Sequence, residues 1–270
     1  MAVEKPRLGA ETHYPESYDP DLLVSIPRSA GRSELVIPCV MHGVDVWTGY
    51  ELSWLNSRGK PRVAIAEFSI SSDSEFIVES KSFKLYLNSL NQYRIDSTEQ
   101  LVALMTRDLS RGFGGPVAIT LYSVDEYARR GVSTLLGECL DDLDVACDHY
   151  QTDGDLLRAD SAEITREQLY SHLLKSNCPV TGQPDWASVV IEYSGGRIDR
   201  EGLLKYLVSF RQHQDFHENC VETLFCELIR RCRPDSLTVY ARYTRRGGLD
   251  INPYRSTAPL EVGFCRLARQ

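Results

Sequence analysis

The feature that most constrains the fold of this chain is an internal repeat. A shift of 120 residues (206 − 86 = 120) brings residues 86–119 onto residues 206–239. The matched pairs are Tyr86 with Tyr206, Leu87 with Leu207, Ser89 with Ser209, Gln92 with Gln212, Leu104 with Leu224, Leu109 with Ile229, Arg111 with Arg231 and Ile119 with Val239. A constant offset over this length indicates two copies of one structural unit, and 270 residues suffice for both.

Each copy has the pattern of strands, then helices, then a further strand. Runs rich in β-branched and aromatic residues predict the strands, and apolar residues three or four apart predict the helices. In the first copy we expect strands at 35–37, 44–47, 62–70 and 117–122, a hairpin turn at 57–60, and helices at 79–87 and 101–109. In the second copy we expect strands at 186–193 and 237–243, a turn at 194–196, and helices from 203 and over 216–232.

This order of elements predicts an α+β fold in which two antiparallel sheets carry helices on one face. We divide the chain into an N-terminal arm at 1–33, a first module at 34–150 and a second module at 151–270. The arm has few large apolar residues, so we expect it to be loosely held. Residues 125–165 are acidic and irregular and are expected to link the modules.

The composition narrows the class of protein. The net charge of −8 argues against a general nucleic-acid or anionic-membrane surface, so we expect neither partner. No stretch approaches about 18 uncharged apolar residues, and residues 1–27 lack the pattern of a secretory signal. The eight cysteines are scattered, without a CxxC motif or a histidine at zinc-finger spacing. We therefore expect a cytoplasmic protein with reduced, mostly inert thiols and no metal site.

The segment 176–185 (SNCPVTGQPD) places a thiol and a carboxylate seven residues apart (185 − 178 = 7). Two prolines restrict the backbone of this segment and a glycine admits a turn that other residues cannot make, which predicts a stiff, shaped loop. A cysteine is nucleophilic as the thiolate, which requires a nearby proton acceptor or positive charge. Asp185 could accept the proton of Cys178 and later act as an acid. The alternative is an ordinary loop beside a buried, inert cysteine.

Three further segments have residues suited to ligand binding. Residues 79–84 (ESKSFK) begin a helix with two hydroxyls and two lysines, which suits phosphate. Residues 213–220 (HQDFHENC) place a histidine beside a carboxylate, which suits the amidine edge of guanine. Residues 243–253 (YTRRGGLDINP) combine arginines and glycines, which suits a phosphate-bearing ligand. The respective alternatives are a capped helix start, a zinc pair of His213 and His217, and a solvated hairpin tip.

Together the four segments supply a nucleophile, an acid/base, a purine clamp and a phosphate cradle, which favours an enzyme. They also carry a family resemblance, through ESKSFKLYLNS at 79–89, SNCPVTGQPDW at 176–186, FHENCVE at 216–222 and YTRRGGLDINPYRS at 243–256. From about residue 35 to its end, the chain resembles the two-module NADPH-dependent 7-cyano-7-deazaguanine reductases of queuosine biosynthesis. The resemblance implies two tandem tunnelling-fold (T-fold) modules, related to GTP cyclohydrolase I, with ligand sites at module interfaces.

The resemblance also implies a reaction and the residues that perform it. The nitrile of 7-cyano-7-deazaguanine is reduced to a primary amine, and two NADPH supply the electrons. Cys178 adds to the nitrile carbon to give a covalent thioimide, Asp185 moves protons, and His217 acts as a donor beside the nitrile. The residues implied to bind the substrate are Val78, Glu79, Ser80, His217 and Glu218. The residues implied to bind NADPH are Ser80, Lys81, Arg246 and Gly247.

The chemistry of the residues agrees with this interpretation. A nitrile is a poor hydride acceptor, whereas a protonated thioimide is a good one, so a covalent thiol step makes the reduction easier. Candidate cations for the 2′-phosphate of NADPH are Lys81, Lys84, Arg245 and Arg246. The alternatives are a cyclohydrolase-like T-fold enzyme with zinc and a non-catalytic purine- or pterin-binding T-fold protein. We expect a small-molecule substrate and a homodimer.

Overall fold

The chain is built on one continuous sheet. The computed structural model describes residues 14–33, 35–37, 39–259 and 262–270. The strands of the sheet are β2 (His42–Leu55), β3 (Pro61–Ser71), β5 (Val117–Tyr122), β6 (Glu138–Cys139), β7 (Ala159–Asn177), β8 (Pro184–Ile198), β9 (Ser236–Tyr243) and β10 (Leu249–Ser256). Across the sheet they follow the order β5, β3, β2, β10, β9, β8, β7 and β6, and neighbours are antiparallel except β6 with β7.

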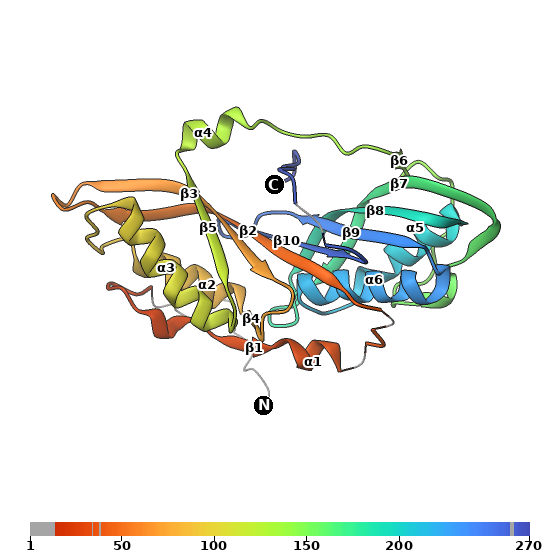
Figure 1. The fold of residues 1–270 in the computed structure, drawn as a ribbon, viewed down its shortest axis with the longest axis horizontal. Helices are drawn as coiled ribbons and strands as arrows, with labels where there is room; N and C mark the ends of the chain where they lie inside the picture. The colour runs from red at the N-terminus through yellow and green to blue at the C-terminus, as the bar shows by residue number, and fades with distance from the viewer. Residues whose placement is uncertain (1–13, 34, 38, 260–261) are drawn as a thin grey trace.

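The helices lie mainly on one side of this sheet. They are α1 (Arg28–Arg32), α2 (Ser80–Ser89), α3 (Thr98–Phe113), α4 (Val124–Arg129), α5 (Arg200–Ser209) and α6 (His217–Cys232). Figure 1 shows α2, α3 and α6 below the sheet, whereas α4 and the C-terminal segment lie above it. The α+β class with antiparallel pairing is confirmed, although the two predicted sheets are one. Among the described residues, no helix has the length and apolar character needed to span a bilayer.

The predicted repeat corresponds to a repeated order of elements. The series β2, β3, α2, α3 and β5 recurs as β7, β8, α5, α6 and β9, and α2 and α5 begin 120 residues apart (200 − 80 = 120). Each half has its own hydrophobic core, which includes Tyr86 and Met105 in the first half and Tyr206 and Leu224 in the second. Because the halves share one sheet, the boundary at residue 150 stays a prediction.

The halves are joined by β10, the additional strand of the second half. Residues 249–256 of β10 pair with residues 42–49 of β2, and residues 254–256 pair with β9 on the other side. This ladder places first-half and second-half elements side by side in one sheet. It thereby brings α2 of the first half and α6 of the second half to a shared region of the molecule.

One predicted strand and one predicted turn are wrong. Residues 35–37 are not in a strand, and residues 194–196, predicted as a turn, lie inside β8. A Cβ on Gly196 would lie 2.9 Å from the carbonyl oxygen of Asp160, so this glycine permits the close approach of β7. The 19-residue strand β7 itself was not predicted, because its first half is exposed and polar and lacks an apolar alternation.

The prediction of a loosely held arm is wrong for the described part of the arm, residues 14–33; residues 1–13 lie outside the described residues. The strand β1 (Ser25–Pro27) pairs with β4 (Phe76–Val78), and α1 follows it directly. Arg28 is buried and donates to Asp45 of β2 at 2.6 Å. The arm is therefore an integral part of the fold.

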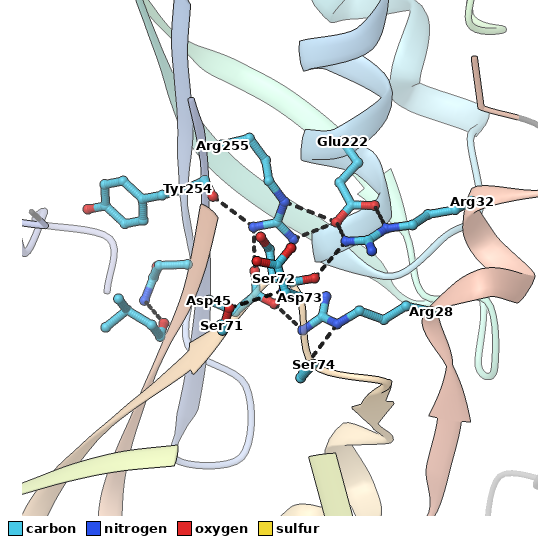
Figure 2. Close-up of polar contacts among 12 residues, drawn as sticks. Arg28, Arg32, Asp45, Ser71, Ser72, Asp73, Ser74, Glu222, Tyr254 and Arg255 are labelled. Atoms are coloured by element: carbon cyan, nitrogen blue, oxygen red, sulfur yellow. Dashed lines mark hydrogen bonds and ion pairs between the residues drawn. The ribbon is translucent and has the colours of Figure 1, made fainter. Parts of the chain in front are cut away.

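A buried charge cluster, formed by Arg28, Arg32, Asp45, Glu222 and Arg255, joins the arm to both halves (Figure 2). The Arg255 guanidinium donates to Asp45 and to Glu222, each at 2.7 Å. Arg32 donates to both oxygens of Glu222, at 2.7 and 2.8 Å. Burial alone would raise the pKa of Glu222, but Arg255 and Arg32 outweigh it and lower this pKa to about 2.

Removing one partner from this cluster should destabilise the fold strongly. We expect Arg255→Met to lower the free energy of unfolding by about 3–5 kcal/mol, because it leaves buried carboxylates without their cation. Denaturant unfolding at pH 7 measures this change. The matched control is Arg197→Met, which breaks an exposed pair with Glu163 and should cost less than about 1 kcal/mol. Equal losses in the two variants would contradict the importance of the cluster.

Candidate active site

A cavity that is partly open to solvent lies where the two halves meet. Its walls include residues at the N-terminal ends of α2 and α6, the loop after β7 and the loop after β9. Cys178, Asp185, His217 and Glu218 all line it. The predicted substrate-binding residues Val78, Glu79 and Ser80 line it as well. Val78 and Glu218, which lie 140 positions apart in sequence (218 − 78 = 140), are thus brought together.

The predicted shaped loop that carries the thiol is confirmed. Cys178 directly follows β7, and Asp185 lies at the start of β8, opposite Ser176. The Cys178 N–H donates to the Gln183 carbonyl at 2.9 Å, and the Gly182 N–H donates to the Cys178 carbonyl at 2.8 Å. Gly182 has a φ of +70°, which this tight closure requires and a glycine adopts without strain. The thiol is half-buried and free.

Asp185 is buried between two cationic or potentially cationic groups. One carboxylate oxygen accepts a hydrogen bond from Arg246, and the other lies 3.3 Å from Nε2 of His217. Burial would raise the pKa of Asp185, but His217 and Arg246 outweigh it and lower the pKa below its ordinary value. The carboxylate is therefore ionised at neutral pH and available as a proton acceptor.

His217 is the first residue of α6 and is held by stacking. Its ring lies parallel to the ring of Tyr243, with centroids 3.8 Å apart and an interplanar angle of 7°. While Nε2 faces Asp185, Nδ1 is buried and has no hydrogen-bond partner among the described residues. Tyr243 ends β9, and no sequence signal distinguishes it as a neighbour of the histidine.

The pKa of Glu218 is shifted in the opposite direction from the pKa of Asp185. Its side chain is buried, and Oε1 has no hydrogen-bond partner within the described part of the chain. Burial and then the charge of Asp45 raise the pKa of Glu218 to about 7, against the lowering effects of Arg28 and His217. A buried carboxylate with an unpaired oxygen is suited to accept N–H groups from a ligand.

Glu79 has a structural contact besides its place in the cavity wall. Its carboxylate caps α2, since it accepts the N–H groups of Lys81 at 2.9 Å and Ser82 at 2.7 Å. The capped helix start, which was the alternative for this segment, is therefore confirmed, whereas the ligand-binding interpretation stays a prediction. A role for Glu79 in gripping the substrate stays a prediction.

A second, larger cavity adjoins the first. It is also partly open to solvent, and it shares Cys178, Ser80 and Arg246 with the first cavity. Lys81, Lys84 and Gly247 also line it. Lys81, Lys84 and Arg246 form a cationic wall of this cavity, and burial and then the charge of Arg246 lower the pKa of Lys84.

This wall fits an anionic cofactor. Gly247 has a φ of +56°, and a Cβ there would lie 3.1 Å from the Lys84 side chain, so glycine keeps the wall open. Of the candidate cations, Lys81, Lys84 and Arg246 line the cavity, whereas the Arg245 guanidinium lies 4.3 Å over the Tyr50 ring. Among the described residues, no group of three or more His, Cys, Asp or Glu is placed to hold a metal ion.

A thiol, an ion-paired carboxylate and an imidazole in one cavity, beside a second cavity with three cationic side chains in its wall, are typical of an enzyme that uses an anionic cofactor. Comparison with known proteins makes this class specific. Residues 14–121 match the family described as "Nitrile reductase, 7-cyano-7-deazaguanine-reductase N-term", and residues 184–261 match "QueF-like protein".

Two relatives cover nearly the whole chain, and both are named NADPH-dependent 7-cyano-7-deazaguanine reductase. The protein from Chromobacterium violaceum is 53% identical over 252 residues, which cover 92% of this chain and 90% of the relative. The protein from Hydrogenovibrio crunogenus is 52% identical over 274 residues, which cover 99% and 98%. The chain therefore belongs to the NADPH-dependent 7-cyano-7-deazaguanine reductase family of oxidoreductases.

The predicted family, its oxidoreductase class and its tandem T-fold are thereby confirmed. One solved structure, the apo form of the archaeosine synthase QueF-Like, aligns with a TM-score of 0.31 and 20% identity. The alignment covers 36% of this chain and 96% of that one, and so low a score carries no argument.

Alkylation should distinguish the loop cysteine from the buried ones. We expect iodoacetamide to modify Cys178 while Cys220, Cys226 and Cys232 stay unmodified in the folded protein. The last three are buried, and burial raises the pKa of Cys226 and of Cys232 to about 12. Peptide mass spectrometry after timed labelling measures the difference, with exposed Cys39 as the accessible control. Protection of Cys178 equal to that of the buried three would contradict its place in the cavity.

Proposed function

We propose that this chain reduces the nitrile of 7-cyano-7-deazaguanine to the amine of 7-aminomethyl-7-deazaguanine, with NADPH as reductant, in queuosine tRNA-modification biosynthesis. The reaction proceeds through a thioimide on Cys178. The observation that carries the proposal is that Cys178, Asp185, His217 and Glu218 line one cavity. The names of the two relatives support the same substrate and cofactor.

Glu218 is the anchor for the deazaguanine ring. A guanine-like amidine edge presents two N–H groups side by side, and an ionised carboxylate can accept both. The buried, unpaired oxygen of Glu218 supports this role, because ligand binding would satisfy it. Trp47 and Ile251 supply apolar wall for the planar ring.

The addition step forms a covalent bond to the substrate. The Cys178 thiol gives its proton to Asp185, and the sulfur bonds to the nitrile carbon. The triple bond becomes a C=N double bond, and its nitrogen takes a proton through His217 or Asp185. Although it is buried, Asp185 has a pKa lowered by His217 and Arg246, so the carboxylate is ionised before the addition and one oxygen can take up the thiol proton.

The reduction needs a second ligand, held in the adjoining cavity by Ser80, Lys81, Arg246 and Gly247. NADPH, when bound there, supplies one hydride for each of two reductions. Across both, the substrate carbon gains two hydrides, the nitrogen gains protons delivered by Asp185 and His217, and Cys178 is released as the C–S bond breaks. A free imine would hydrolyse in water, so an interior cavity between the two halves suits this chemistry.

We further propose that the protein is cytoplasmic and forms a homodimer. All eight cysteines are free, which supports a reducing compartment. The homodimer is supported by the family resemblance alone.

The direct test of the proposed function is turnover. Purified protein should consume two NADPH for each 7-cyano-7-deazaguanine converted, followed as loss of nicotinamide absorbance. Cys178→Ala should abolish this consumption while still binding the substrate in calorimetry, because the ring contacts do not involve the sulfur. Cys39→Ala, which removes an exposed thiol, is the control and should turn over normally. Turnover by the Cys178→Ala variant would overturn the covalent step.

The Arg246–Asp185 pair predicts a pH effect on addition. A carboxylate base works above its pKa, so the rate of addition falls as the pH falls through that value. Arg246→Met removes a cation that lowers the pKa of Asp185 and should move the acidic limb of the profile upward, by about one pH unit for a tenfold change in proton affinity.

The measurement is the rate of covalent adduct formation without NADPH, by rapid quench and intact mass, so that cofactor binding does not enter. The matched control is Arg245→Met, whose guanidinium stacks on Tyr50 instead. An acidic limb that stays in place in the Arg246→Met variant would remove Arg246 from the control of Asp185.

A further inference from the structure

The buried charge cluster carries an unequal number of charges. Its three arginines face two carboxylates, Asp45 and Glu222, which leaves a net charge of +1 (3 − 2 = 1). Four of the five side chains are nearly inaccessible, and Arg32 is 22% exposed. An uncompensated buried charge is strongly unfavourable, so a further anion nearby would stabilise the cluster.

Glu218 is placed to be that anion. It precedes Glu222 by four residues on α6, so the two side chains lie on the same face, one turn apart. The positive charge of Arg28 favours its ionised form, and the negative charge of Asp45 opposes it. Ionised Glu218 brings the region to three carboxylates against three arginines. The charges of Arg28 and Asp45 in the cluster therefore act on Glu218, which lines the cavity.

The N-terminal arm also contacts α6 next to Glu218. A Cβ on Gly31 would lie 2.0 Å from the Asn219 side chain, so α1 lies directly against the residue that follows Glu218. Arg28 is fixed there by Ser74 at 3.1 Å and Asp45 at 2.6 Å. Its Nη1, like Oε1 of Glu218, is buried and unpaired among the described residues. Figure 2 shows Arg28 reaching from α1 toward Asp45 and Ser74.

We propose that Arg28, on the N-terminal arm, is a positioning residue for substrate recognition: its charge favours the ionised form of the buried Glu218, which is the form that accepts the amidine edge of the substrate. The inference rests on the function proposed above for Glu218. It makes the arm part of the substrate site, although no residue of α1 lines the cavity in the described structure.

At physiological pH, the ionised and protonated forms of Glu218 are both populated. Its pKa of about 7 means that a modest change in nearby charge alters how much of it is ionised. The charged or titratable groups on the elements packed around Glu218 are Arg28 from α1, Asp45 from β2, Arg255 from β10, and His217 and Glu222 from its own helix. Those in the rest of the cavity wall are Glu79, Lys84, Asp185, Asp215 and Arg246. A protonated Glu218 has one acceptor fewer for the two N–H groups, so binding weakens below this pKa.

The experiment measures noncovalent binding of 7-cyano-7-deazaguanine against pH from 5.5 to 9. It uses full-length protein with Cys178→Ala, without NADPH, in calorimetry. Adding Arg28→Met should weaken binding about fivefold at pH 7 and about tenfold at pH 5.5, with recovery toward pH 9, because the pH of half-maximal affinity moves up by about one unit from about 7. Arg32→Met is the matched control: it removes the same charge from the same helix but contacts Glu222. It should leave the pH of half-maximal affinity in place.

Two further variants keep the test decisive if Arg28→Met does not fold. Arg28→Lys retains the charge and should retain the parental pH of half-maximal affinity. Asp45→Asn removes the opposing charge and should move it to lower pH. A profile unchanged in Arg28→Met, or moved upward in Asp45→Asn, would overturn the inference.

The variant Glu218→Gln distinguishes an error in the role of Arg28 from an error in the proposed function. Glu218→Gln should bind weakly at every pH, because a neutral amide cannot replace the carboxylate at two N–H groups. Normal binding by Glu218→Gln would refute the anchor role of Glu218 itself. Loss of binding in Glu218→Gln with an unshifted Arg28→Met profile would refute only the role of Arg28.

Discussion

The site depends on the pairing of β2 with β10, which joins the two halves of the chain in one sheet. Residues 42–49 and 249–256 form this ladder, and Asp45 and Arg255 from the two strands meet in the buried charge cluster. The same strands bring Trp47 and Ile251 into the cavity wall. Because each half contributes one wall, neither half has a complete site alone. In this chain the tandem repeat therefore supplies both walls of the site.

Two carboxylates in this small region are held in contrasting states. Asp185, with Arg246 and His217 as partners, has a lowered pKa, whereas Glu218, buried and only partly compensated, has a raised one. Such a separation allows one carboxylate to move protons while the other recognises the ligand. Arg246 connects Asp185 to the second, cation-lined cavity, since it pairs with Asp185 and also lines that cavity. A ligand that drew Arg246 away would raise the pKa of Asp185 and favour its acid form.

Much of this could be predicted from the sequence, and the failures have physical causes. The repeat and the helices followed from apolar spacing, and the residues of the cavity followed from short motifs whose side chains have distinctive chemistry. The strand β10 was missed because Asp250, Asn252 and Pro253 are unusual in a central strand; Pro253 is tolerated where β9 does not pair. The ordered arm was missed because Arg28 and Arg32 are anchored by charges distant in sequence. Pairing of that kind leaves no local pattern.

The central claim is that the sulfur of Cys178 bonds to the nitrile carbon of a ring anchored by Glu218. A crystal structure of the protein with 7-cyano-7-deazaguanine, grown without NADPH, tests it most directly. The account predicts continuous density from Sγ of Cys178 to that carbon, with the amidine edge at Glu218 and Asp185 beside the sulfur. A ring bound with its nitrile turned away from an unmodified Cys178, or with its amidine edge on other residues, would contradict it.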